Sequence, residues 1–190
     1  MFKCGSSSTD YHTSNSMKTL EIRRHTMRAK PGQHLSQEGV TLAHRIGEAM
    51  GPFDRVVTST VPRAFETAIA MGFAVDAQEE LIAPYGQDVE DEFPWPQPFS
   101  GYAEEALRGG AVAHYVNRLT CFYHDLLDSI PKGSCALVVN HGGVVEMSTV
   151  ACFPDADYYK SFGGPVDYCE GVRLFRKKNE FVRAEILRIQ

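Results

Sequence analysis

Two strand-like runs, far apart in the chain, each end directly at a histidine. The first covers residues 19–24 and enters His25, and the second covers 136–140 and enters His141. Apolar residues that alternate or follow one another, and that end in polar residues or glycine, predict buried strands that run into loops. In open α/β sheets, the loops at the carboxyl ends of the strands line the ligand crevice. The sequence therefore predicts an α/β sheet that brings both imidazoles to one edge.

The rest of the chain alternates between helical and strand patterns. Apolar residues at helical spacing predict helices over 40–50, 62–72 and 144–151, and two helices within 103–127 divided at Gly109-Gly110. Strands are predicted over 53–59, at Val75 and over 81–82, and a hairpin over 171–187 turns near Lys178 and Asn179. This order predicts a three-layer α/β/α sandwich with a mostly parallel central sheet, to which the hairpin adds antiparallel pairing at the edge.

The segment 83–101 is the least regular part of the sequence. Its prolines and glycines predict a long loop that contains neither a helix nor a central strand. A connection of this length in a compact domain is typical of a lid or a binding loop. Phe93 and Trp95 are therefore interpreted either as a lid over a pocket or as a hydrophobic plug beneath the loop.

Composition restricts the class of protein. The chain has 190 residues, 43% hydrophobic and 23% charged, which fits one soluble globular domain over 17–190. Residues 1–16 are polar and lack periodicity, so we expect a flexible extension there. No apolar run approaches the ~20 residues that span a bilayer, and the first residues carry no apolar segment of a secretory signal. These features argue against a membrane or secreted protein.

Charge and cysteine content restrict the partners and the location. A net charge of −5, without a basic stripe, argues against a nucleic-acid-binding protein. Five cysteines occur without a C-x-x-C pair, so neither a zinc ribbon nor a dithiol redox motif is supported. We therefore expect free thiols in a reducing cytoplasm, with Cys121 and Cys135 in the core. The sequence leaves the oligomeric state open.

Polar clusters follow three of the predicted strands. They are Arg24-His25-Thr26, then Thr58-Ser59 with Arg63 in the first turn of the next helix, and His141-Gly142-Gly143. A guanidinium group can donate two parallel hydrogen bonds to phosphate oxygens, and helix N-termini add backbone N–H groups. A neutral histidine can attack phosphorus and hold the phosphoryl group covalently. Together these residue types favour phosphate chemistry.

The same residues occur in four ordered blocks between about Thr19 and Val150. The blocks are Arg24-His25, Leu35-Ser36-x-x-Gly39, Thr58-Ser59-x-x-x-Arg63-Ala64-x-x-Thr67-Ala68, and a strand that ends in His141-Gly142. In this order the chain resembles the histidine phosphatase superfamily, also called the phosphoglycerate mutase-like superfamily. The resemblance implies a phosphoglycerate mutase-like fold. The Leu81-x-x-Pro84-x-Gly86 pattern looks more like the short phosphohistidine-phosphatase branch.

The resemblance implies a role for each matching residue. His25 would be the nucleophile that becomes phosphorylated, Arg24 and Arg63 would bind the phosphoryl oxygens, and His141 would stabilise the transition state. Nearby arginines disfavour protonation of His25 and so keep its lone pair available. Ser59 and Gly142 are further candidates for contact with the substrate. No H-E-x-x-H motif occurs, and we expect neither a catalytic metal nor a cofactor.

Two departures from the family pattern leave questions open. The family usually has glycine after the arginine–histidine pair, where this chain has Thr26, whose hydroxyl could add a donor. The acidic proton donor of many members is missing after Leu81, and Glu90, Asp91 or Glu92 could replace it, with Glu90 as first choice. Arg28, in the same loop as His25, is interpreted either as a phosphate ligand or as a surface arginine.

These patterns together predict a cytoplasmic phosphatase. It would hydrolyse a phosphomonoester or a phosphoramidate through a phosphohistidine at His25, without added metal, on a phosphorylated small molecule or phosphoprotein. Two alternatives remain open: a non-catalytic module that binds phosphate through Arg24 and Arg63, and a phosphoglycerate mutase-type phosphotransferase. The modest length of the 83–101 segment favours the phosphatase over the mutase, because mutases of the superfamily generally carry longer insertions.

Overall fold

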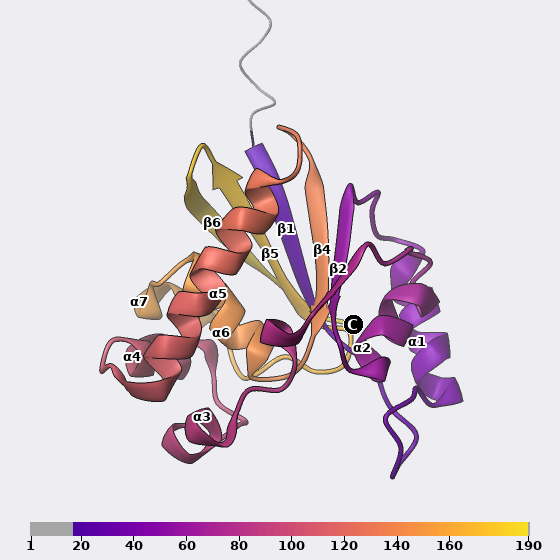
Figure 1. Cartoon of the computed structure of the whole chain (residues 1–190), viewed down its shortest axis with the longest axis horizontal. Helices are drawn as coiled ribbons and strands as arrows, with labels where there is room; N and C mark the ends of the chain where they lie inside the picture. The colour runs from indigo at the N-terminus through magenta and orange to yellow at the C-terminus, as the bar shows by residue number, and fades with distance from the viewer. Residues whose placement is uncertain (1–16, 190) are drawn as a thin grey trace, which may run out of the picture.

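The computed structural model describes residues 17–189, so the predicted extension over 1–16 lies outside the described residues. These residues form a central six-stranded sheet with helices on both faces (Figure 1). The strands are β1 (Met17–Arg24), β2 (Arg55–Ser59), β3 (Ala77–Glu79), β4 (Cys135–Asn140), β5 (Gly171–Lys177) and β6 (Glu180–Leu187). Their order across the sheet is β3-β2-β4-β1-β5-β6. The predicted sandwich with a mostly parallel sheet is confirmed.

Strand pairing brings the two histidines together. β1 and β4 are parallel neighbours, with Arg24 opposite Asn140 in the register. The backbone N–H of His25 donates to the carbonyl of Asn140 at 2.9 Å, so His25 and His141 leave the sheet side by side. β2 lies parallel to β4 on its other side. The antiparallel hairpin of β5 and β6 continues the sheet beyond β1, as predicted.

Helices cover the two faces of the sheet in two groups (Figure 1). The α-helices are α1 (Gln37–Gly47), α2 (Pro62–Ala70), α3 (Gln87–Glu92), α4 (Phe99–Ala106), α5 (Gly110–Asp128), α6 (Val144–Cys152) and α7 (Ala156–Tyr159), with 3₁₀ turns at Glu80–Ile82 and Lys160–Phe162. The larger core lies on the α5 and α6 side of the sheet and includes Leu20 and Ile22 of β1. A smaller core packs β2 and β4 against α2. The core side of each helix therefore follows the apolar spacing of the sequence.

Local sequence explains how α1 begins and ends. Ser36 caps it, since its Oγ accepts the backbone N–H of Gly39 at 3.1 Å, which is the usual chemistry of a helix N-terminus. The helix ends at Gly47, where an added Cβ would lie 2.1 Å from the carbonyl oxygen of Met71. Glycine at position 47 thus lets α1 approach the end of α2 closely.

Several predicted elements need correction. The segment 83–101 contains α3 and the start of α4, because the helices fit between the prolines rather than across them. Residues 81–82 lie in a 3₁₀ turn, and the third strand begins at Ala77 instead of Val75. Cys121 is exposed and Cys135 is only half-buried, so neither is a core residue. The division at Gly109-Gly110 and the hairpin turn at 178–179 are confirmed.

Within residues 17–189, no helix combines the length and the apolar character that crossing a membrane requires.

Candidate active site

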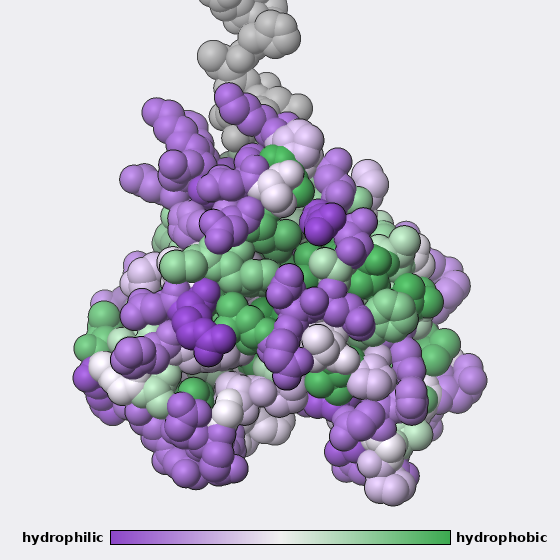
Figure 2. Space-filling model, in the orientation of Figure 1, coloured by the Kyte–Doolittle hydropathy of each residue, from purple (hydrophilic) through white to green (hydrophobic). Residues whose placement is uncertain are grey.

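A cavity of about 320 Å³ opens at the carboxyl edge of the sheet, where β1, β2 and β4 end. Figure 2 shows the molecule hollowed at this edge, between the lobe that carries α3 and the lobe that carries the loop before α1. We call it the active-site cavity; it is lined by the candidate residues Arg24, His25, Arg63, Glu90, His141 and Gly142, and by Pro84, Tyr85, Gly86, Gln87 and Trp95. The ends of β1 and β4, the first turn of α2 and the 84–95 segment therefore contribute to one pocket.

His25 has a defined tautomer. Its Nδ1 lies 2.6 Å from the carbonyl oxygen of Thr26, and a carbonyl can only accept, so Nδ1 carries the proton. Nε2 then keeps its lone pair, which accepts a hydrogen bond from Arg63 Nε at 3.0 Å. Burial, and then the charges of Arg63 and Arg24, lower the pKa of His25 from 6.5 to about 3. His25 is thus a neutral imidazole whose Nε2 lone pair is directed at the Arg63 guanidinium.

His141 lies against His25, with the ring centroids 5.0 Å apart. Its Nε2 is 2.7 Å from Ser59 Oγ, and its Nδ1 is 3.2 Å from Arg63 Nη2. Because a guanidinium only donates, Nδ1 accepts and Nε2 donates to the hydroxyl. Burial, followed by the neighbouring His25 and Arg63, lowers the pKa of His141 to about 2. An anion in the cavity would favour the charged form of this imidazole again.

Arg63 lies in the first turn of α2 and contacts both histidines. Its Nη1 donates to Gln33 Oε1, from the loop before α1. Burial, and then the positive charges of Arg28 and Arg24, lower the pKa of Arg63. Several cations are therefore concentrated around a cavity that carries few negative charges, an arrangement that an incoming phosphate would stabilise.

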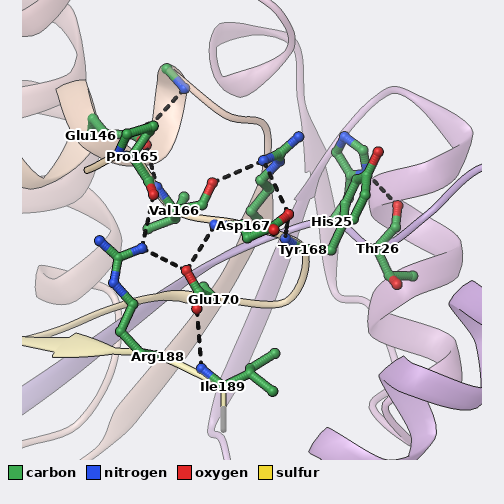
Figure 3. A network of polar contacts seen from close by, with 12 residues as sticks. His25, Thr26, Glu146, Pro165, Val166, Asp167, Tyr168, Glu170, Arg188 and Ile189 are labelled. Atoms are coloured by element: carbon green, nitrogen blue, oxygen red, sulfur yellow. Dashed lines mark hydrogen bonds and ion pairs between the residues drawn. The ribbon is translucent and has the colours of Figure 1, made fainter. Parts of the chain in front are cut away.

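Arg24 is held between two aromatic rings. Its guanidinium carbon lies 5.1 Å from the ring centroid of Trp95 and 4.6 Å from that of Tyr168, both within cation–π range. Its Nη1 donates to the carbonyl of Val166 at 2.8 Å and lies 3.8 Å from Asp167. Figure 3 shows Tyr168 next to His25, with Asp167 and then Val166 farther from that histidine. The segment 165–168 therefore fixes the orientation of Arg24.

Comparisons with known proteins identify the fold. No family model and no curated protein match the sequence. Solved structures do match: a phosphoserine phosphatase from Entamoeba histolytica in complex with 3-phosphoglyceric acid has 16% identity and a TM-score of 0.65 over 91% of this chain and 98% of the other. A phosphoglycerate mutase from Bacillus anthracis has 13% identity and a TM-score of 0.62 over 91% and 93% of the two chains. The chain therefore has the phosphoglycerate mutase-like fold of these structures.

A third match comes from a phosphatase with an anion present. A mycobacterial glucosyl-3-phosphoglycerate phosphatase, in a structure with vanadate, has 18% identity and a TM-score of 0.61 over 90% of this chain and 99% of the other. The shared fold thus extends over nearly the whole of each chain, in agreement with the fold implied by the four sequence blocks. At these identities the likeness concerns the fold, and the chemistry depends on the residues of the site.

Three predicted substrate-binding residues do not line the active-site cavity. Thr26 is fully buried, with a negative φ, and its backbone N–H donates to Thr67 Oγ1 at 3.1 Å. Ser59 is also fully buried and reaches the cavity only through His141. Arg28 Nη1 donates to the carbonyls of Pro31 and Gly32 in its own loop. These residues therefore support the loops of the site instead of forming its wall.

The three acidic candidates occupy different positions on or near α3. Glu90 lines the active-site cavity. Asp91 accepts a hydrogen bond from Gln87 at the exposed side of the same helix. The Glu92 carboxylate accepts the backbone N–H groups of Ala111 and Val112 and so holds the start of α5. Of the three, only Glu90 lines the active-site cavity.

Sequence reasoning missed two residues that shape the site. Glu146, fully buried, accepts the backbone N–H of Gly143 at 2.7 Å and that of Val166 at 2.9 Å, which joins the loop after His141 to the segment that orients Arg24. Burial raises the pKa of its carboxyl group. Tyr168 lies in a segment that reads only as a turn, and no motif marks it. Glu146 offered a weak signal, an acidic residue three positions after a helix-starting glycine.

The structure also resolves the roles of Phe93 and Trp95. Phe93 packs in the core against Tyr102, with ring centroids 5.1 Å apart, as a hydrophobic plug. Trp95 forms part of the cavity wall, where a Cβ added to Gly142 would lie 3.0 Å from its ring. Glycine at 142 therefore allows Trp95 to close one side of the pocket. Among residues 17–189, no group of three or more histidine, cysteine or acidic side chains could hold a metal ion.

Proposed function

We propose that this protein is a phosphatase that hydrolyses a phosphomonoester or phosphoramidate through a covalent phosphohistidine at His25. The observation that carries the proposal is the state of His25: a neutral imidazole whose Nε2 lone pair faces a cavity lined by Arg24, Arg63 and His141. A nucleophile is effective when its lone pair is free at neutral pH and positioned toward the reacting atom.

In the first proposed step, the phosphoryl oxygens accept the Arg63 Nε–H in place of His25 Nε2, which releases the Nε2 lone pair. Nε2 then attacks phosphorus, and an N–P bond forms as the bond to the leaving group breaks. Arg24 and Arg63 stabilise the charge on the phosphoryl oxygens, and His141 adds to this stabilisation. Glu90, in its protonated form, donates a proton to the leaving oxygen or nitrogen. The Nδ1–H of His25 remains bonded to the carbonyl of Thr26, which stabilises the positive charge on the phosphorylated ring.

In the second proposed step, a water molecule attacks the phosphoryl group. The Glu90 carboxylate accepts a proton from that water, the N–P bond breaks, and its electron pair returns to His25 Nε2. Inorganic phosphate leaves, and both residues regain their starting forms. The cycle consumes one water molecule for each phosphoryl group.

The neighbouring structures support a small phosphorylated substrate. They include a phosphoserine phosphatase and a glucosyl-3-phosphoglycerate phosphatase, both of which act on small phosphorylated molecules. We extend this substrate class to the present chain, together with metal-independent hydrolysis by a single domain over 17–190 in the cytoplasm. Chelation with EDTA is then expected to leave turnover unchanged.

The test compares the wild type with His25→Ala and with His44→Ala, which changes an exposed histidine on α1. p-Nitrophenyl phosphate and phosphohistidine serve as substrates, because their leaving groups need little protonation. We expect His25→Ala to lower kcat by at least about 10³-fold and His44→Ala to match the wild type. Activity of His25→Ala close to that of the wild type would eliminate the mechanism.

The same experiment separates the two alternatives. A module that binds phosphate without cleaving it would hydrolyse neither substrate in the wild type, yet would retain phosphate binding that Arg63→Ala abolishes. A mutase would require a bisphosphate primer and would isomerise a phosphorylated sugar acid faster than it hydrolysed it. Either result would replace the phosphatase proposal.

A further inference from the structure

A second cavity, of about 250 Å³, is lined by four arginines: Arg23, Arg45, Arg173 and Arg188. We call it the arginine cavity. Its remaining walls are apolar and come mainly from Ile46 and Met50, at and after the end of α1. No acidic side chain lines it, and it shares no lining residue with the active-site cavity.

The alternation of β1 separates the two sites. Arg23 and Arg24 are adjacent in this strand, so their side chains point to opposite faces of the sheet. Arg23 shares its face with Glu21, and Arg173 of β5 is paired with Glu21 in the antiparallel register. The arginine cavity therefore lies where the end of α1 meets β1 and β5.

The acidic groups near this cavity are already engaged. The Glu21 carboxylate, only 1% exposed, accepts from Arg23 Nε at 2.7 Å and from Arg173 Nη2 at 2.7 Å. Glu170 accepts from Arg188 Nη1 at 2.6 Å. Within residues 17–189, Arg45 has no acidic partner. Glu185, opposite Arg173 in the register of β5 and β6, is paired with Arg183 at 3.1 Å. The four guanidinium groups of the cavity are thus bonded to two carboxylates, and the surplus charge is positive in a chain whose net charge is −5.

The existing ion pairs leave donors free. Arg23 uses Nε and Nη1, and Arg173 uses Nε and Nη2. Arg23 Nη2, Arg173 Nη1 and the guanidinium of Arg45 have no hydrogen-bond partner in the part of the chain that the structure describes. The bonds to Glu21 already hold the guanidinium groups of Arg23 and Arg173 in place. A ligand that binds them therefore costs little further side-chain entropy.

We propose that the arginine cavity binds a phosphorylated organic anion that carries two or more negative charges. Free guanidinium donors suit phosphate oxygens, which accept paired hydrogen bonds from them. The apolar wall at Ile46 and Met50 accommodates the carbon part of the ligand. This binding site is independent of the proposed hydrolysis, since it holds no histidine and no other nucleophile among its lining residues.

One segment, residues 165–170, connects the two cavities. The Glu170 carboxylate accepts the backbone N–H of Asp167 at 2.8 Å and that of Ile189 at 3.2 Å, while Asp167 lies beside Arg24 (Figure 3). Arg188 also donates to the carbonyls of Phe162 and Pro165. The residues that orient Arg24 are therefore connected to one wall of the arginine cavity.

The test measures the binding of methylenediphosphonate, an anion without a hydrolysable bridge, to the full chain by calorimetry. We expect two sites per chain in the wild type, of which orthovanadate blocks one. Arg63→Ala should remove the vanadate-sensitive site and keep the other. Arg45→Glu should weaken the vanadate-insensitive site at least tenfold, whereas Arg108→Glu, a change at an exposed arginine between α4 and α5, should leave both sites as they are.

Amide chemical shifts supply the location independently of the variants. Binding in the presence of vanadate should shift the amides of 45–50 and 188–189, and leave those of 141–143 in place. The proposal is overturned if only the vanadate-sensitive site exists, if the second site survives Arg45→Glu unchanged, or if Arg108→Glu weakens it equally. Loss of the vanadate-sensitive site alone would count against the proposed phosphatase and leave this inference standing.

Discussion

The active-site cavity and the arginine cavity are both lined by guanidinium groups, and both draw an arginine from β1. In the first, Arg24 and Arg63 surround two imidazoles that burial keeps neutral, and no carboxylate is bonded to the guanidinium of Arg63 among the described residues. In the second, Arg23 and Arg173 share the Glu21 carboxylate. Positive charge predicts that both cavities bind anions. Only the active-site cavity also contains a histidine nucleophile, His25, and for that reason we propose phosphoryl transfer there alone.

The largest expected difference between the cavities follows from removing one arginine. Arg63→Ala takes away the donor to His25 Nε2 and the neighbour of His141, so we expect kcat/KM for p-nitrophenyl phosphate to fall by about 10³-fold. Arg108→Ala, a change at an exposed arginine, serves as the matched control and should stay within twofold. A loss of kcat/KM below tenfold in Arg63→Ala would contradict the role in phosphoryl transfer that we propose for Arg63.

The second difference is the acid, which only the active-site cavity contains. Glu90→Gln should lower kcat about 10²-fold for an alkyl phosphate such as phosphoserine, whose leaving oxygen needs a proton. For p-nitrophenyl phosphate the same change should cost less than threefold. Asp91→Asn, on the exposed side of α3, is the control. Equal losses on both substrates would remove Glu90 from the role of proton donor.

The third difference is the pH dependence of stability. The pKa values of His25 and His141 are about 3 and about 2 in the folded protein, against 6.5 in the unfolded chain, so below pH 6.5 the unfolded chain binds protons that the folded protein does not. The contribution of each histidine to the free energy of unfolding is fully present above pH 6.5. It is lost as the pH falls, by about 2 kcal/mol per histidine between pH 7 and pH 5. The arginine cavity contributes nothing in this range, because arginine stays charged.

Urea unfolding of the wild type and of His25→Asn at pH 7 and pH 5 measures this contribution. The variant should lose about 2 kcal/mol less than the wild type over the interval. His44→Asn, at an exposed position on α1, should behave as the wild type does. If His25→Asn lost as much unfolding free energy between pH 7 and pH 5 as the wild type does, the imidazole of His25 would be protonated in the folded protein.

The smallest expected effect concerns the residue behind His141. Ser59→Ala removes the oxygen that lies 2.7 Å from His141 Nε2, and we expect kcat to fall roughly tenfold while KM changes little. Thr60→Ala, at the next and exposed position, is the control. A rise in KM without a fall in kcat would place Ser59 in substrate binding, as the sequence first predicted.

Much of the fold could be predicted because its signals are local. Leu20 and Ile22 alternate with polar residues, and residues 135–139 are continuously apolar before Asn140, so both strands and their ends could be located. Glycines at 109–110 and the polar turn at 178–179 marked two boundaries correctly. The prediction of a loop without helices over 83–101 failed because tertiary packing determines the structure of this segment. Val89 and Phe99 are buried in the main core, which stabilises short helices between the prolines.

The sequence predicts the central residues of the candidate site but not the contacts that hold them in place. His25, Arg24, Arg63 and His141 follow strand ends or start a helix, and the sheet geometry alone brings such positions together. Thr26 and Ser59 have the right chemistry at the right place in the sequence, but their burial depends on side-chain direction, which no motif encodes. Tyr168 reaches Arg24 only because β5 pairs with β1, a long-range contact without a local signal.

The most direct test of the account is to trap the intermediate. The wild type is mixed with a substrate labelled in the phosphoryl group, quenched within milliseconds, and digested so that the labelled peptide can be identified. We predict label that is stable in base, is released in acid, and maps to His25, with none in His25→Ala and the wild-type amount in His44→Ala. Label on another residue, or turnover of wild-type protein with no label at any quench time, would contradict the account.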